Sequence, residues 1–340
     1  MWRKLLLSSV VLVLVAGAAF AADVFELKIS YNGPPDEKEN AVHSYVVKLQ
    51  KFIEEGTGGR IKFTLFPNSG LGKEEERMDL TRTMPIMNVA SYAGVAPLFP
   101  ELYAASIPFM FDSYKAAHIF FDESEYWKKA QEAFKMRTGV ALLEAVEEGG
   151  FLAFTNSKRE IRSPKDFKGL KFRAMDEGQI IIYKSMGASA VPIPWTELYM
   201  ALKTGVVDGQ MNPPMYIIIG SLYEVQKYMC MANVQYSDQF LVVNAKWFDS
   251  LSPEDQKLIL EAAKKANVLN RQEVESMVDK RVEFLKEKGM QVYYPTKEEM
   301  DEFRNTVQPA YVDWLKKKVG EDWLNLALEC AKRANEKASK

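Results

Sequence analysis

Residues 252–289 read SPEDQKLILEAAKKANVLNRQEVESMVDKRVEFLKEKG, and no glycine or proline lies between Pro253 and Gly289. Ser252 can cap a helix with its hydroxyl group, and proline is favoured at the first helical position. The pattern predicts one helix of about 36 residues, roughly 54 Å long. Because such a helix is longer than a small lobe is wide, we expect it to span two lobes. Two shorter helices that meet near Asn270 are the alternative.

The rest of the chain alternates between strand and helix patterns, which predicts an α/β fold. Strands are predicted at residues 25–31, 61–66, 86–90, 140–145, 151–155, 170–174 and 239–244. Helices are predicted at residues 42–53, 74–83, 177–186 and 196–203, and again within 307–338. The charged run from Lys73 to Arg77 is interpreted as the solvated start of a helix.

Residues 1–22 are typical of a secretory signal peptide. Arg3 and Lys4 precede an apolar run at 5–15, and Ala19-Phe20-Ala21 supplies a small-residue cleavage pattern. A membrane anchor is the alternative, but a spanning helix needs roughly 20 apolar residues. We therefore expect an exported, periplasmic protein.

The composition favours two lobes and excludes a nucleic-acid partner. Removing the signal peptide leaves about 318 residues, which is more than one hydrophobic core usually serves. The formal net charge changes from −2 to about −4, because the removed segment holds two basic residues and no acid. This mildly acidic balance is not that of a nucleic-acid-binding protein. We expect a monomer.

Cysteines and histidines are too few to predict a metal centre. Cys230 and Cys330 are the two cysteines, and they form either a disulfide bond or, as we expect, two buried free thiols. His43 and His118 are the two histidines, and no cluster has the spacing of zinc ligands. No metal site and no cofactor are predicted.

No motif indicates catalysis. The chain lacks the Gly-x-Ser-x-Gly turn of hydrolases. Residues 70–73 resemble a phosphate loop, but Pro67 occupies the position of its first glycine. Residues 56–59 end a helix and precede a strand, the reverse of a dinucleotide-binding turn. The carboxylate pair Glu147-Glu148 is interpreted as a surface feature, so we expect no enzyme.

Several segments together resemble one transport family. They are KGLKFR (168–173), GAS (187–189), PWTELYMALKTG (194–205), VDGQMNP (207–213), LFPNSGLG (65–72), FPE (99–101) and the long helix after Ser252. The chain resembles the extracytoplasmic solute receptors of tripartite ATP-independent periplasmic (TRAP) transporters. The resemblance covers the mature chain in order, and residues 197–212 are its most specific part.

The resemblance implies a two-lobed periplasmic binding protein with a ligand cleft between α/β lobes. The first lobe is expected to hold residues 23–150 and 238–278. The second lobe is expected to hold residues 151–237 and 279–340. The implied partners are a small organic acid and the membrane subunits of a TRAP transporter.

A carboxylate-binding site is also implied. In similar proteins the arginine matching Arg173 grips the substrate carboxylate, the asparagine matching Asn212 supports that contact, and an aromatic residue matching Trp195 lines the pocket. Asn32 and Ser91 match positions that face the ligand from the other lobe. A guanidinium suits this role because its rigid fork can bind both oxygens of a carboxylate.

The two central residues have structural alternatives. Arg173 could pair permanently with an internal acid such as Asp176. Asn212 could merely brace the turn at residues 213–214. Arg173 stands among apolar neighbours in its strand, so an unpaired guanidinium there would be costly without a ligand.

Three further residues are candidate ligand contacts. Tyr216, Tyr92 and Gln239 are predicted to reach the ligand. Aromatic residues of α/β proteins usually belong to the core, and this alternative applies to both tyrosines and to Trp195.

Two differences from sialic-acid receptors bear on the ligand. Those receptors carry a second pocket arginine about twenty residues before the first, where this chain has Ala153. A glutamate found opposite Ser91 in those receptors also has no predicted counterpart. We therefore expect a smaller or more apolar acid than sialic acid.

The resulting hypothesis is a non-catalytic receptor that captures a small organic carboxylate and delivers it to a TRAP transporter. A binding protein of an ATP-driven importer is the first alternative. A secreted hydrolase or lyase is the second.

Overall fold

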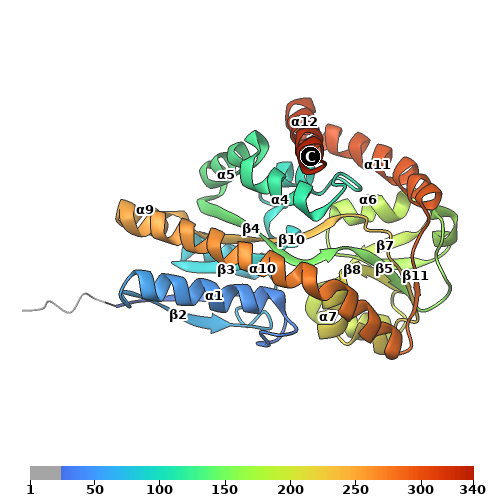
Figure 1. Ribbon diagram of the computed structural model, residues 1–340, viewed down its shortest axis with the longest axis horizontal. Helices are drawn as coiled ribbons and strands as arrows, with labels where there is room; N and C mark the ends of the chain where they lie inside the picture. Colours follow the sequence, from blue (N-terminus) through green and yellow to red (C-terminus); the bar gives the residue numbers. More distant parts are fainter. Residues whose placement is uncertain (1–23) are drawn as a thin grey trace, which may run out of the picture.

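The computed structural model describes residues 24–340, so the predicted signal peptide lies outside the described residues. The chain forms two α/β lobes, each built on its own sheet. Helix α10 (Pro253–Glu287) runs along both lobes, as Figure 1 shows. The fold class predicted from the sequence is confirmed.

The first lobe contains a five-stranded sheet. Its order is β2 (Ile61–Phe66), β1 (Phe25–Ser30), β3 (Ile86–Ala90), β10 (Tyr236–Asn244) and β4 (Val140–Phe151). β1 is parallel to β2 and β3, whereas β10 is antiparallel to β3 and β4. Strand β4 continues beyond its predicted end at residue 145. Two glutamates and two glycines follow there and hide the apolar pattern of the strand.

The second lobe contains a six-stranded sheet. Its order is β11 (Gln291–Tyr293), β9 (Tyr228–Cys230), β5 (Ala153–Asn156), β8 (Gly209–Asn212), β6 (Lys171–Ala174) and β7 (Ser189–Pro192). β6 is parallel to β7 and β8, and β5 is antiparallel to β8 and β9. Strands β7, β8, β9 and β11 were not predicted, although β5 and β6, which are no longer than β7 and β8, were.

The chain passes between the two sheets more than once. It crosses first at Leu152, between β4 and β5, and returns between β9 and β10. It crosses again along α10, which packs against α1 and β4 and then against α8 and β11. α10 has 35 residues without a break, so the prediction of one helix is confirmed and the alternative of a break near Asn270 is wrong.

The remaining helices cover the two sheets. They are α1 (Ala41–Gly56), α2 (Glu74–Thr83), α3 (Tyr92–Val95), α4 (Tyr114–Glu123), α5 (Glu125–Thr138), α6 (Glu177–Ser185), α7 (Trp195–Lys203), α8 (Pro214–Ile219), α9 (Ala245–Ser250), α11 (Lys297–Val319) and α12 (Glu321–Ala338), with short 3₁₀ turns at Pro100–Ser106, Pro164–Phe167 and Leu222–Glu224.

The two C-terminal helices lie together across the top of the molecule in Figure 1. α11 packs against α6, and α12 packs against α4 and α5. The two C-terminal helices together therefore connect α4 and α5 with α6. The residue bounds of the two lobes stay a prediction.

Cys230 and Cys330 are both buried and free, so the disulfide alternative is wrong. Cys230 belongs to β9, and Cys330 belongs to α12. Within residues 24–340, no helix is both long enough and apolar enough to cross a bilayer.

Candidate functional site

A cavity of about 350 Å³ lies between the two lobes, within the range of small-molecule sites. Predicted contact residues from both lobes line it, namely Asn32, Ser91, Arg173, Trp195, Asn212, Tyr216 and Gln239. Tyr92 does not line this cavity. It lines a smaller neighbouring cavity, which shares Glu148, Met175 and Asn212 with the larger one.

Arg173 lies on β6 and is buried, with 4% of its surface exposed. Its Nε donates a hydrogen bond of 2.8 Å to the carbonyl oxygen of Ile193. Its two terminal nitrogens have no hydrogen-bond or ion-pair partner within the described part of the chain. Burial lowers the pKa of Arg173 to about 10, so the side chain keeps its positive charge at neutral pH. The cavity therefore contains a cation that no neighbouring acid neutralises directly.

Asp176 is the acid that could have paired with Arg173, and it has a different role. Its carboxylate caps α6 by accepting a hydrogen bond of 2.9 Å from the backbone N–H of Gln179. Burial raises the pKa of Asp176 to about 6, although its hydrogen bonds and the charge of Arg173 act in the opposite direction. No ion pair joins Asp176 and Arg173 in residues 24–340, so the structure does not show the permanent pairing.

The second lobe surrounds Arg173 with polar and aromatic groups. Asn212 ends β8, and its Nδ2 donates to the Oε1 of Gln210 instead of bracing the turn that follows. The rings of Trp195 and Tyr216 meet edge to face, with centroids 4.9 Å apart. Pro192, Ile193 and Pro194 complete this wall with mainly apolar surface.

The first lobe supplies a polar wall that the sequence did not reveal. Asn32 donates 2.7 Å to Glu74 Oε1, and the backbone N–H of Ser91 lies 3.3 Å from Glu74 Oε2. Arg77 is almost fully buried and forms an ion pair of 2.6 Å with Glu74. It also donates 2.9 Å to Asn32 Oδ1. Glu74 thus lines the cavity, whereas Arg77 does not line it and holds the carboxylate of Glu74 from the interior.

Two expectations about this wall are wrong. The charged run that starts α2 is solvated at Lys73, Glu75 and Glu76, but Glu74 and Arg77 point inward. A glutamate does lie beside Ser91, because Glu74 reaches it from the neighbouring helix. In a helix, every third or fourth residue lies on the same face. Glu74 and Arg77 lie on the inward face of α2, and their charge gave no indication of this.

Glu148, on β4, also lines the cavity. Its Oε1 accepts 2.7 Å from the hydroxyl of Ser237, and its Oε2 accepts from the amide of Gln239. The same amide donates 2.7 Å to the hydroxyl of Tyr216. Burial raises the pKa of Glu148 to about 7, although these hydrogen bonds lower it. The Oε1 of Gln239 is buried and has no partner in residues 24–340.

The interpretation of Glu147 and Glu148 as a surface pair is wrong. Both are buried, because neighbouring side chains of a strand point to opposite faces and both faces of β4 are covered. Glu148 faces the cavity, and Glu147 faces a separate cluster with His118 and Glu275. That cluster is the one group in residues 24–340 whose atoms are close enough to hold a metal ion, and none of its members lines the cavity.

Tyr92 contributes indirectly. Its hydroxyl lies 3.4 Å from both oxygens of Asp238, and both residues line the smaller cavity. Burial raises the pKa of Asp238 well above its usual range, and the nearby charge of Glu148 adds to this.

One ion pair joins the lobes at the edge of the cavity. Lys73, at the start of α2, lies 2.6 Å from Glu197 on α7. Both side chains are about half exposed to solvent, and Lys73 also lines the cavity.

Comparison with known proteins gives one consistent family. Residues 35–318 match the model of the bacterial extracellular solute-binding proteins, family 7. A 2,3-diketo-L-gulonate-binding periplasmic protein of Escherichia coli K12 is 30% identical over 283 residues, which cover 82% of this chain and 85% of that protein.

Solved structures agree. The fold is similar to a sugar-acid-binding protein of Advenella mimigardefordensis in complex with galactonate, with a TM-score of 0.84 and 30% identity over 92% of this chain and 99% of that one. It is also similar to a TRAP periplasmic solute-binding protein of a Polaromonas species bound to D-erythronate. There the TM-score is 0.81 and the identity 31%, over 89% of this chain and 98% of that one.

Proposed function

The chain belongs to family 7 of the bacterial extracellular solute-binding proteins, the solute receptors of TRAP transporters, and we propose that it captures a small organic carboxylate through Arg173. The family consists of transport proteins and not of enzymes, which decides against the secreted hydrolase or lyase. Membership of the TRAP receptors also decides against a binding protein of an ATP-driven importer.

The unneutralised charge of Arg173 carries this proposal. A buried guanidinium without an ionic partner is costly, and a bound carboxylate removes that cost. The two terminal nitrogens of Arg173 have no protein partner among residues 24–340, so they can donate to both oxygens of the ligand. Asn212 lines the cavity with Arg173 and can donate a further hydrogen bond to the same carboxylate.

The acidic residues of the cavity favour a ligand with hydroxyl groups. Glu74 and Glu148 line the cavity together with Arg173, and their carboxylate oxygens can accept hydrogen bonds. A ligand hydroxyl can donate to such oxygens, whereas a second carboxylate would be repelled by the glutamates. We propose that the ligand is a hydroxylated monocarboxylic acid. This proposal differs from the expectation of a more apolar acid.

The relatives support this substrate class. The proteins of Advenella mimigardefordensis and Polaromonas bind galactonate and D-erythronate, which both carry several hydroxyl groups beside one carboxylate. The cavity of about 350 Å³ is large enough for acids of this kind. Trp195 and Tyr216 offer an apolar face against which the carbon chain of such an acid can pack.

We propose that the protein acts in the periplasm and delivers the acid to membrane subunits. The relative of Escherichia coli is a periplasmic protein, and residues 1–22 have the pattern of an export signal. The cavity lies between two lobes, so a bound ligand can favour the closed arrangement over the open one. The transporter would then receive the closed, loaded form.

A thermal-shift screen of matched acids and amides tests the carboxylate proposal. Hydroxylated monocarboxylic acids of four to six carbons should raise the melting temperature, since ligand at 100 times Kd stabilises by about 2.7 kcal/mol. The carboxamide of the best acid should give no shift at the same concentration, because it has no charge for Arg173. An equal shift with acid and amide would refute recognition of the carboxylate.

A further inference from the structure

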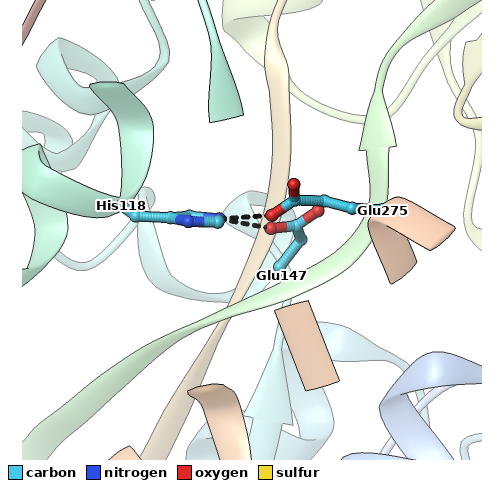
Figure 2. Close-up of side chains that lie close together, drawn as sticks. All are labelled: His118, Glu147 and Glu275. Atoms are coloured by element: carbon cyan, nitrogen blue, oxygen red, sulfur yellow. Dashed lines mark hydrogen bonds and ion pairs between the residues drawn. The ribbon is translucent and has the colours of Figure 1, made fainter. Parts of the chain in front are cut away.

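His118, Glu147 and Glu275 converge although they lie far apart in the sequence. His118 comes from α4, Glu147 from β4 and Glu275 from α10. The Nε2 of His118 lies 2.7 Å from Glu147 Oε2 and 3.7 Å from Glu275 Oε1. One ligand atom of each residue lies within 4.8 Å of the other two. Figure 2 shows the imidazole on one side and both carboxylates turned toward its edge.

Glu147 has an unsatisfied oxygen in the interior. The residue is fully buried, and its Oε2 accepts 2.8 Å from the hydroxyl of Tyr236 in addition to the contact with His118. Its Oε1 has no hydrogen-bond partner within residues 24–340. A buried carboxylate oxygen without a partner is costly, so this atom indicates that a group is bound there.

The neighbouring arginine does not neutralise the two carboxylates. Arg271 precedes Glu275 by one turn of α10, and its Nη1 lies 2.9 Å from Asp122. Its Nη2 lies 3.9 Å from Glu144. Neither Glu147 nor Glu275 forms an ion pair with Arg271 in the described structure. Among residues 24–340, His118 is the one basic side chain within ion-pair distance of both carboxylates.

One imidazole nitrogen and two carboxylate oxygens form a donor set that suits Zn²⁺ and similar divalent transition metals. Ligand bonds of 2.0–2.2 Å in a tetrahedral site place neighbouring donor atoms about 3.3 Å apart. The distances of 2.7 Å and 3.7 Å from His118 bracket this value, so small side-chain movements are sufficient. Glu275 is 40% exposed and His118 is 18% exposed, which gives an ion access from solvent.

We propose that His118, Glu147 and Glu275 form a binding site for a divalent transition-metal ion of the zinc type. Three protein ligands leave one position for water. The ion would connect β4 and α10, two elements that lead from one lobe toward the other, to α4. Glu148, the neighbour of Glu147, lines the ligand cavity, so the metal would stabilise this segment of its lining.

Calorimetric titration with zinc chloride tests this site. The protein is first treated with a chelator and dialysed. Wild type should bind one equivalent with a Kd in the micromolar range or tighter. His118→Asn and Glu275→Gln should each weaken binding at least about tenfold. Glu283→Gln is the matched control, because Glu283 is an exposed carboxylate two turns further along α10 and should leave binding unchanged.

A spectroscopic measurement separates metal binding from a purely structural role. Co²⁺ should give the visible absorption of a tetrahedral site in wild type and in Glu283→Gln, and this absorption should be lost in His118→Asn. Near-ultraviolet circular dichroism without metal should show that each variant is folded. If wild type binds no zinc, or if both cluster variants bind it as tightly as wild type, the site does not exist.

Discussion

Arg173 and Glu148 are buried ionisable groups that line one cavity. Burial shifts both pKa values toward the neutral form, to about 10 for Arg173 and about 7 for Glu148. The arginine keeps its charge at neutral pH, whereas Glu148 is partly protonated. In this cavity Arg173 can bind a carboxylate, and Glu148 can accept a hydrogen bond from a hydroxyl group of the same ligand.

The raised pKa of Glu148 makes stability depend on pH. Above about pH 4.5 the unfolded chain releases this proton, but the folded protein retains it until about pH 7. The free energy of unfolding should therefore fall as the pH rises between these values and then level off. Glu148→Gln should reduce the loss between pH 5 and pH 8 by about 2 kcal/mol, measured by urea denaturation.

Glu132→Gln is the matched control for that experiment, because Glu132 is exposed on α5. Its pH dependence should equal that of wild type. If Glu148→Gln also kept the wild-type pH dependence, Glu148 would not be the proton-binding group that its burial implies.

The sequence predicted most of the residues that line the cavity and missed two of its glutamates. Arg173, Trp195 and Asn212 lie in segments with family-specific patterns, so their approximate positions could be carried over. Glu74 and Glu148 are glutamates in runs of charge, which on their own indicate solvent. Only the direction of each side chain within its folded element distinguishes them from surface residues.

Helix α10 is held against β4 by buried amides. Asn267 donates 2.8 Å to the carboxylate of Glu144 and 2.8 Å to the carbonyl oxygen of Ala145. Asn270 donates 2.6 Å to the carbonyl oxygen of Glu147. These hydrogen bonds join the helix to residues 144–147 of β4, the edge strand of the first sheet.

Asn267→Ala should destabilise the protein by about 1–3 kcal/mol, because it leaves buried groups of β4 without partners. Urea denaturation measures this difference. Gln272→Ala is the control, since Gln272 is exposed on the same helix and its loss should change stability by less than about 0.5 kcal/mol. Equal effects of the two substitutions would show that the amide contacts do not hold α10 in place.

The longest helix was predictable, whereas several of the short strands were not. The unbroken helical pattern of α10, with its Ser252 cap, is a strong local signal, and the helix has one of its predicted ends at Pro253. Strands of three or four residues, such as β9 and β11, exist because a neighbouring strand pairs with them. Such pairing is a tertiary property that the local sequence does not contain.

Across the whole molecule, the cavity depends on contact between the lobes. Lys73 and Glu197 come from different lobes and form an ion pair at the cavity edge. The sequence did not indicate this contact, because the two residues lie 124 positions apart, at the start of α2 and on α7. Contacts between distant segments depend on the folded arrangement. The sequence could therefore indicate single contact residues but not the residues that pair with them.

Glu197→Gln should weaken ligand binding by about two- to fivefold at low ionic strength, because an exposed ion pair contributes little and is screened by salt. The difference from wild type should disappear at about 1 M salt. Glu261→Gln is the matched control, since Glu261 pairs with Lys257 within α10 and joins no lobes. An unchanged affinity in Glu197→Gln at low salt would show that the ion pair does not support the closed arrangement.

The most direct measurement is calorimetric titration of Arg173→Ala with the acid that binds wild type best. Removing one partner of a desolvated charged pair should cost about 2–5 kcal/mol, which is a loss of affinity of about 30-fold or more. Arg173→Lys should bind more weakly than wild type, because an ammonium group cannot bind both carboxylate oxygens as the fork does. If Arg173→Ala binds the acid as tightly as wild type, Arg173 is not the carboxylate anchor and the proposed recognition is wrong.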